Sequence, residues 1–220
     1  MSEEALSEET SEGPDAAWFH RLQAGRRMCR DFSGAPLDES VVARLVDAAL
    51  GAPAAGNTHG LDLLLLRDAD PQRYWQATMD PARRRGFRWQ GLFAAPLLIV
   101  PYVDPDAYAQ RYSGADKSHS GLGDVGRWSV PYWFVDGGAA VMALLLAAEA
   151  EGLGALLFGQ FDHEAVVREA FGVPEDRRAV GTIALGHPRV AGRSRSTSAL
   201  RGRPNAAERV HRGAWGGTSR

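Results

Sequence analysis

The feature that most constrains the fold of this chain is a long stretch without any charged side chain, from Gly137 to Ala148. A helix of this composition is too apolar for a protein surface, and the stretch is too short to span a bilayer. We therefore expect a buried helix, packed either in a core or between subunits. Shorter apolar runs bounded by turn-forming residues predict strands, at Leu61–Leu66, Leu97–Val103, Ala155–Phe158 and Val180–Leu185.

Helices are expected between these strands. The first runs from Asp15 to Gly25, and a second begins after Asp38, a residue type that caps helices, and ends at Gly51. Asp-Pro pairs predict three more helix starts, since the acid can cap a helix and proline suits its first turn. These pairs are Asp70-Pro71, Asp80-Pro81 and Asp104-Pro105.

The composition is that of a globular protein, with 45% hydrophobic and 24% charged residues in a chain of 220. We see no internal repeat and expect one α+β domain of mixed connectivity over residues 14–220. Residues 1–13 are acidic, serine-rich and poor in apolar side chains, which predicts a disordered tail. The periodicity ends at about residue 189, where we expect an extended C-terminal arm that lies across a ligand or a second subunit.

The charge and cysteine content limit the binding partners and the cellular compartment that we expect. The formal net charge is -2, so the molecule as a whole has no electrostatic reason to bind nucleic acid or an anionic membrane. Cys29 is the only cysteine, so no disulfide forms within the chain, and a lone thiol suits a reducing compartment. The N-terminus does not show the basic and apolar segments of a secretory signal. We expect a cytoplasmic protein.

Several familiar catalytic patterns are not met. A G-x-G-x-x-G sequence at Gly121, Gly123 and Gly126 has no predicted strand before it and no helix at its third glycine, so we interpret it as a loop. The histidines show no pair at metal-ligand spacing and one cysteine cannot complete a zinc set, so no metal site is predicted. No serine-nucleophile motif is found. Cys29 lies among arginines that could activate it, but we favour an ordinary buried thiol.

Four clusters have the composition of anion-binding or close-approach sites. Residues 25–32 place three arginines between two helices, where guanidinium groups could hold a phosphate. The small residues of Pro53–Thr58 and the glycines of 152–162 would let backbone come close to a flat ring. Arg201 and Arg203 add two guanidinium groups late in the chain. Each cluster taken singly is equally compatible with surface arginines, turns and loops.

In their order and spacing, the four clusters resemble the FMN-dependent nitroreductase family over residues 24–215. The family's R-R-S-x-R-x-F motif is matched by Arg26, Arg27, Met28, Arg30 and Phe32. Its P-S-x-x-N-x-Q-type loop is matched by residues 53–58, and a D-x-G-A-A segment by 136–140. A G-L-G-A strand that ends in G-x-F-D, an L-G-x-P segment and an R-x-R-P segment follow at 152–162, 185–188 and 201–204.

The resemblance implies an α+β fold with a mixed central sheet flanked by helices, in an intertwined homodimer with two FMN sites at its interface. The FMN phosphate and ribityl chain would be held by Arg26, Arg201 and Arg203, with Arg27 and Met28 in the same motif. Arg30 would lie near the pyrimidine side of the ring, where a cation favours the anionic reduced flavin. The other subunit would reach the ring through Pro53, Ala54, Ala55 and Asn57. The segment that lies along the face of the ring would consist of Leu157, Phe158, Gly159 and Gln160. The backbone amide of Gly159 or Gln160 could donate to flavin N5.

Three positions depart from the family pattern. Met28 stands where a hydroxyl usually binds phosphate, which could lower the affinity for FMN by about 1 kcal/mol. His59 follows the loop in place of a glutamine, and Gly159 stands where some members have an acid. The last two positions shape the pocket over the flavin.

The activity implied by the resemblance is a ping-pong cycle. NAD(P)H reduces FMN, and the flavin passes hydride to a nitroaromatic, a quinone or a similar small acceptor. No side-chain acid or base is required, so no catalytic residue is assigned. Two alternatives stay open, a specialised flavoprotein of the same superfamily that acts on one metabolite and a non-catalytic flavin-binding protein. The aromatic stretch Trp128–Phe134 could form a lid over the ring or pack in the core.

Overall fold

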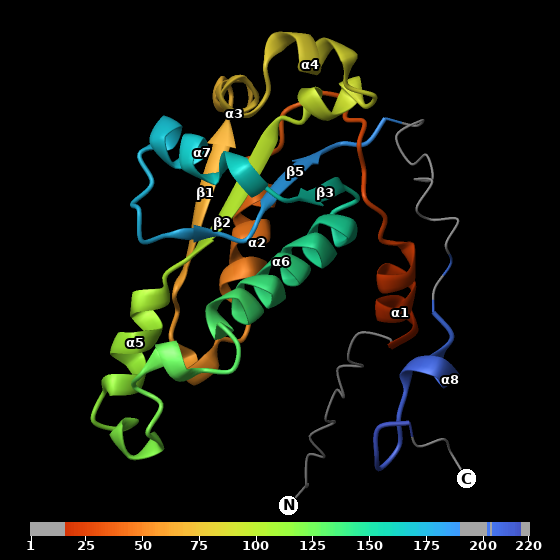
Figure 1. Ribbon diagram of the computed structural model, residues 1–220. Helices are drawn as coiled ribbons and strands as arrows, with labels where there is room; N and C mark the ends of the chain where they lie inside the picture. The colour runs from red at the N-terminus through yellow and green to blue at the C-terminus, as the bar shows by residue number, and fades with distance from the viewer. Residues whose placement is uncertain (1–15, 190–201, 203, 217–220) are drawn as a thin grey trace, which may run out of the picture.

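The computed structural model describes residues 16–189, 202 and 204–216, and its centre is a five-stranded sheet (Figure 1). Four strands are neighbours in the order β1 (Leu61–Arg67), β2 (Leu97–Val103), β5 (Thr182–Gly186) and β3 (Gly154–Phe158). The short β4 (Arg178–Ala179) pairs with the end of β2. The four predicted strands are confirmed, and none of their boundaries moves by more than two residues.

The α+β class is also confirmed, but the prediction of a mixed sheet needs correction. Every pair of strands in the described part of the chain is antiparallel. Parallel pairing there is limited to an isolated bridge between Met28 and Ala155. Apolar runs locate strands along the chain, but the direction of a neighbouring strand depends on the connections, which such runs do not reveal.

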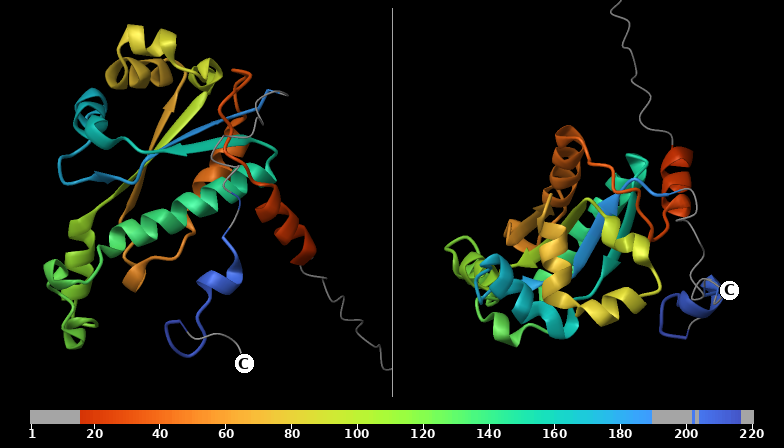
Figure 2. Two further views of the ribbon diagram at one scale, coloured as in Figure 1. Left: turned by 45° about the vertical axis from the view of Figure 1, so that its right-hand side comes forward. Right: turned by 90° about the horizontal axis from the view of Figure 1, so that it is seen from above.

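Alternate residues of β2 face two cores, one on each side of the sheet. Leu97 and Ile99 face a core that includes α2 (Glu39–Leu50) and α6 (Tyr132–Ala150). Leu98 and Val100 face a core that includes α3 (Asp70–Thr78) and α7 (Glu164–Phe171). Because both faces of β2 are covered, all seven of its residues are buried. The helices therefore form a layer on each side of the sheet (Figure 2).

Helix α6 contains the uncharged stretch and extends it toward the N-terminus to Tyr132. At 19 residues it is long and apolar enough to cross a membrane, so the prediction that it is too short was wrong. The core helices of soluble proteins also meet this criterion. Six residues of α6 are buried: Gly137, Ala140, Val141, Leu144, Leu145 and Ala148. The expected buried helix is thus confirmed for one of its faces.

Of the four helix starts predicted at capping aspartates, two are capped by the aspartate side chain. The carboxylate of Asp80 accepts the N–H of Arg83 at the start of α4 (Pro81–Gly86), and Asp104 caps α5 (Pro105–Ser113) in the same way. Asp38 occupies the N-cap of α2, but its side chain accepts no capping hydrogen bond. At α3 the prediction was off by one residue, because Asp70 lies in the first turn and Ala69 takes the cap position.

The first and last helices of the described chain contribute nothing to the core. Helix α1 (Ala16–Gly25) has no buried residue, nor has α8 (Ala206–Arg209), which belongs to the predicted arm. The predicted tail 1–13, most of the arm, and Arg201 and Arg203 lie outside the described residues. The single domain from 14 to 220 stays a prediction.

Candidate functional site

A pocket of about 360 Å³ lies where β3 ends, between the strand and the segment from α3 to residue 92. One wall is formed by the predicted ring-facing residues Leu157, Phe158, Gly159 and Gln160, together with Arg30. A second wall is rich in aromatic side chains, and its members include Tyr74, Trp75, Phe87 and Trp89; the ring of Trp75 stacks on Phe158 with centroids 5.5 Å apart. None of the lining residues is acidic. The pocket therefore offers an apolar slot for a flat ring with cationic side chains at its edge.

The arginine-rich junction after α1 is held against the start of β3. The N–H of Cys29 donates to the carbonyl of Ala155 at 2.8 Å, beside the Met28–Ala155 bridge. This pairing aligns residues 28–30 with the strand, which explains why Arg30 reaches the pocket at the strand's far end. The thiol of Cys29 is buried and donates to the carbonyl of Asp31, as expected of a structural cysteine.

The three side chains at the start of this motif differ in their surroundings. One guanidinium nitrogen of Arg26, Nη1, is buried without a hydrogen-bond partner among the described residues. Arg27 is exposed, and its Nη1 donates to the carbonyls of Ala24 and Arg26. Met28 packs against both hydrophobic cores. A buried cationic donor without a partner is costly unless a ligand completes it, so Arg26 fits an anion such as a phosphate.

The side chain of Gln160 is held by a hydrogen bond to the buried hydroxyl of Thr182. Its Nε2 donates to Oγ1 of Thr182 at 3.1 Å, and that hydroxyl also bonds the phenol of Tyr74 at 2.8 Å. Oε1 of Gln160 has no partner in the described structure, although 95% of the residue is buried. Burial raises the pKa of Tyr74 to about 12, so the phenol is neutral and available as a hydrogen-bond donor. The side chain of Gln160 is therefore anchored among buried polar groups, which fixes the backbone of residues 159 and 160 at the pocket.

The predicted loop Pro53–Asn57 lies elsewhere in the chain and is clamped by two helices. Oδ2 of Asp136 on α6 accepts the N–H of Ala55 at 2.7 Å and the hydroxyl of Tyr108 at 2.7 Å. Nε of Arg111 on α5 donates to the carbonyl of Gly56 at 2.7 Å. The clamp holds a strained turn, because Asn57 has a φ of 55° in the left-handed region.

The same helices carry an aromatic cap. The ring of Trp128 packs edge-on against Tyr108, Tyr112 and Tyr132, with centroid distances of 6.3, 4.9 and 5.6 Å. Within the chain this segment packs on α5 and the start of α6, but none of the residues Trp128–Phe134 is buried, so the lid and core alternatives both stay open. Burial, together with the hydrogen bond to Asp136, raises the pKa of Tyr108 above its ordinary range. The phenol thus remains a donor to the carboxylate that holds the loop.

The two parts of the predicted site line separate pockets that share no residue: Pro53 and Ala54 lie with Asp136 and Gly137 in one, and Arg30 lies with Leu157–Gln160 in the other. On α6, Asp136 near the start of the helix holds the loop, whereas Gly25 and Arg27 lie beside Glu149 near its end. Thirteen residues of helix separate the two acids, which is about 20 Å at 1.5 Å per residue. One copy of the chain therefore brings Arg30 together with Leu157–Gln160 but does not bring the loop to them.

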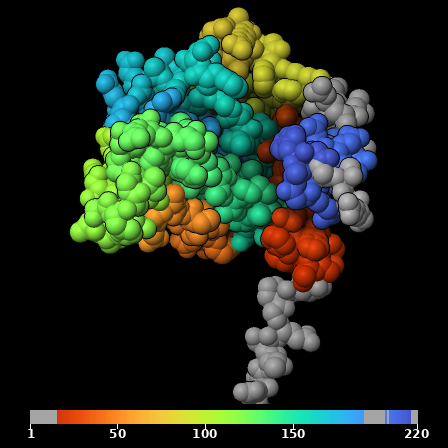
Figure 3. All heavy atoms as spheres, turned by 60° about the horizontal axis from the view of Figure 1, so that its bottom comes forward, coloured from red at the N-terminus to blue at the C-terminus, as the bar shows by residue number. Residues whose placement is uncertain are grey.

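An apolar stripe on α6 faces outward. Val135 is 54% exposed and Met142 39% exposed, and Gly138 between them is also exposed. Their spacing places the three residues on one face of the helix. In Figure 3 the green-to-teal atoms of this region lie open on the face that is turned forward. Large apolar side chains exposed in a row are typical of a surface that contacts another protein.

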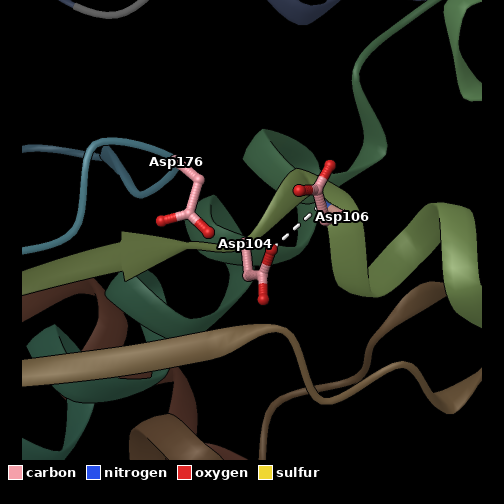
Figure 4. A group of neighbouring side chains, drawn as sticks. All are labelled: Asp104, Asp106 and Asp176. Atoms are coloured by element: carbon pink, nitrogen blue, oxygen red, sulfur yellow. Dashed lines mark hydrogen bonds between the residues drawn. The ribbon is translucent and has the colours of Figure 1, made fainter.

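A group of acids elsewhere is neutralised by an arginine. Asp104, Asp106 and Asp176 have carboxylate oxygens within 4.8 Å of one another (Figure 4). Arg177 forms ion pairs with Asp104 at 3.1 Å and Asp176 at 2.9 Å, and Asp104 also caps α5. The carboxylates of Asp104 and Asp176 therefore already have partners, and the backbone N–H of Asp106 is bonded to Asp104 as part of the helix cap.

Sequence reasoning found one wall of the pocket and missed the rest. The aromatic wall from α3 and residues 87–92, and the clamp formed by Asp136, Tyr108 and Arg111, were not predicted. Asp136 had a signal, since it is the only charge near the start of an apolar helix, where a carboxylate needs partners. No pattern in the sequence indicated the aromatic wall, because its residues are of the types found in any hydrophobic core.

Comparison with known proteins gives a consistent result. The sequence model described as the Nitroreductase family matches residues 24–187. A protein of Archaeoglobus fulgidus named as an NADH dehydrogenase/NAD(P)H nitroreductase is 26% identical over 167 residues, which cover 74% of this chain and 82% of that protein. Among solved structures, nitroreductase CinD from Lactococcus lactis, in complex with nicotinic acid, has a TM-score of 0.69 at 19% identity, covering 87% of this chain and 97% of that one. A protein of Clostridium difficile named as an FMN-dependent nitroreductase has a TM-score of 0.58 at 18% identity, covering 80% and 91%.

Proposed function

Because this chain belongs to the nitroreductase family, we propose that it is an FMN-dependent enzyme that takes hydride from NAD(P)H and passes it to a small electrophilic acceptor. A nitroaromatic or a quinone is the acceptor class that the family resemblance favours. The family makes the chain an NAD(P)H-dependent oxidoreductase, and the ping-pong order and the acceptor are the proposed parts.

The observation that carries the proposal is the division of the site between two pockets. Pro53 and Ala54 line one pocket, where Asp136 clamps the loop Pro53–Asn57, whereas Arg30 and Leu157–Gln160 line another. A second copy of the chain would bring its own loop to this pocket, and the exposed stripe of Val135, Gly138 and Met142 offers a surface for that contact. We therefore infer a homodimer with two equivalent sites.

The residues present fit FMN. Nη1 of Arg26 is a buried cationic donor that would take the phosphate, and Arg201 and Arg203 are proposed for the same group from the arm. Arg30 would lie by the pyrimidine edge, where its charge stabilises negative charge on the ring. The backbone of Gly159 and Gln160 would pass along the ring, with the side chain of Gln160 held away by Thr182. Bound FMN would supply the hydride chemistry.

The protein's own part in the reaction is positioning and exclusion. The aromatic wall excludes water from one side of the ring, and the loop of the partner would cover the other. No acid lines the pocket, so protons for the product are proposed to come from solvent. The proposal accordingly assigns no catalytic side chain.

The proposal is tested by anaerobic mixing of the purified, flavin-loaded protein with NADH and with NADPH. Loss of the yellow flavin absorbance on mixing, and its return when a quinone is added, are the expected results. A protein that binds FMN but is reduced by neither nucleotide would contradict the enzyme and favour a flavin-binding role. A colourless protein that takes up no added FMN would contradict both.

A further inference from the structure

The rim of the pocket carries an unusual concentration of positive charge. The segment Arg83–Arg88 contains four arginines and no acid, and Arg83 lines the pocket together with Arg30. The only acid just before this segment, Asp80, is occupied in capping α4 through the N–H of Arg83. Three of the four arginines are exposed: Arg83, Arg85 and Arg88.

These arginines are not paired with carboxylates, unlike many others in the protein. Arg44, Arg67, Arg111, Arg177, Arg178 and Arg189 each form an ion pair with an acid. Among the described residues, no acid forms an ion pair with Arg30 or with the four arginines of 83–88. The charge at the pocket mouth is therefore left uncompensated, where it can act on a ligand.

Two of the cations are held in place by one indole ring. The guanidinium carbons of Arg30 and Arg88 lie 5.1 Å and 5.5 Å from the ring centroid of Trp89. Stacking on an aromatic ring orients a guanidinium while leaving its N–H groups free to bind. Trp89 itself lines the pocket, so the oriented charges lie at its mouth.

We propose that Arg83 and Arg88 bind the pyrophosphate of the nicotinamide dinucleotide that reduces the flavin. This inference rests on the proposed function, because the nicotinamide must reach the flavin in the pocket and its phosphates must then lie at the rim. The pyrophosphate carries two negative charges, and planar guanidinium groups match its oxygens in bidentate pairs. The G-x-G-x-x-G segment Gly121–Gly126 does not serve, since it follows the 3-10 helix Ser118–Ser120 and ends within the 3-10 helix Val125–Arg127, without the strand and α-helix that a dinucleotide fingerprint needs.

The test compares a charged and an uncharged hydride donor on the same flavin-loaded protein. NADH carries the pyrophosphate, whereas 1-benzyl-1,4-dihydronicotinamide has the reactive ring and no phosphate. Anaerobic stopped-flow reduction gives an apparent Kd and a limiting rate for each donor. The double variant Arg83→Gln/Arg88→Gln should raise the apparent Kd for NADH about 10-fold or more. Its limiting rate, and its reduction by the neutral donor, should stay within about twofold of the wild type.

Two further variants sharpen the result. Arg73→Gln removes an equivalent charge, since its guanidinium also stacks on a ring, that of Phe171 at 4.8 Å, but Arg73 does not line the pocket. It should leave the Kd for NADH unchanged. The variant Arg83→Lys/Arg88→Lys keeps the charge but not the planar, bidentate geometry, and should recover only part of the affinity. Equilibrium titration with NAD+, followed through the flavin spectrum, should show the same order of affinities without turnover.

The outcomes separate the two proposals. An unchanged Kd for NADH in the double glutamine variant, or an equal change for both donors, would overturn the phosphate site and leave the enzyme intact. Failure of both donors to reduce the wild-type flavin would remove the proposed function and this inference with it.

Discussion

The carboxylate of Asp136 accepts the backbone N–H of Ala55 at 2.7 Å, which ties the buried helix α6 to the loop proposed to cover a flavin. The same oxygen accepts the hydroxyl of Tyr108 at 2.7 Å. A charged acceptor with two short hydrogen bonds is strong, and a loop with left-handed residues needs such support. Cofactor affinity should therefore depend on a residue that touches no cofactor.

Asp136→Asn tests this relationship. The amide keeps the shape but loses the charge, and its NH2 group cannot accept a hydrogen bond. We expect a loss of about 1 to 3 kcal/mol from the clamp, with part of it appearing as weaker FMN binding. Fluorescence titration of the apoprotein with FMN measures the affinity. Tyr108→Phe removes only one of the two donors and should have a smaller effect. Equal FMN affinity in Asp136→Asn and the wild type would show that the loop does not reach the ring.

Arg26 and Arg27 are neighbours with different expected roles. Arg26→Gln should weaken FMN binding by about 1.5 to 3 kcal/mol, because its buried Nη1 lacks a partner within the described chain. Arg27→Gln is the matched control, since this guanidinium is exposed and donates to backbone carbonyls. Titration with FMN and with riboflavin, which has no phosphate, distinguishes the contact. If Arg26→Gln weakens both ligands equally, the arginine does not bind the phosphate.

The exposed stripe of α6 predicts the oligomeric state. Met142→Glu places a charge at the centre of the proposed interface, where burial without a partner costs several kcal/mol. We expect sedimentation to show a shift from dimer to monomer and a parallel loss of bound FMN. Val166→Glu is the control, because Val166 is also 39% exposed but lies on α7, away from the stripe. A wild-type protein that sediments as a monomer and still binds FMN would contradict the two-chain site.

Two adjacent glycines in α6 should respond in opposite directions to alanine. A Cβ on Gly137 would lie 2.7 Å from Cγ2 of Val180 and 3.0 Å from Cγ1 of Val103, so Gly137→Ala should cost about 1 to 2 kcal/mol of stability. Nothing within the described chain lies within 4 Å of a Cβ on Gly138, so in the Met142→Glu background, where the proposed interface is broken, Gly138→Ala should gain up to about 1 kcal/mol from helix propensity. Urea denaturation of both variants at one protein concentration measures the difference. Stabilisation by Gly137→Ala would show that α6 does not approach β2 this closely.

Two buried phenols predict sensitivity to alkali. Burial raises the pKa of Tyr74 and of Tyr102 from 10.0 to about 12. In the unfolded chain both ionise near pH 10, so unfolding releases protons between pH 10 and 12. The stability that they contribute is present below pH 10 and is lost as pH rises toward 12, by on the order of 2 kcal/mol for each phenol. Denaturation midpoints measured across this range should fall steeply, and less so in Tyr102→Phe. An identical pH dependence in that variant would exclude Tyr102 as a source.

The sequence by itself determined the strands and most helices, because a period of two or an apolar run bounded by breakers depends only on neighbouring residues. It also placed Arg26, Arg30 and Leu157–Gln160 in a candidate site, through the order of motifs that resemble a family. Tertiary structure decided the rest. Strand direction, the aromatic wall around Trp75 and Trp89, and the clamp on Ala55 all join residues far apart in the chain. Such contacts depend on how the layers pack on the sheet, and no local pattern encodes that packing. For the same reason only the fold could reveal that the two parts of the site line separate pockets of one chain, and this separation is the basis for the proposed second copy.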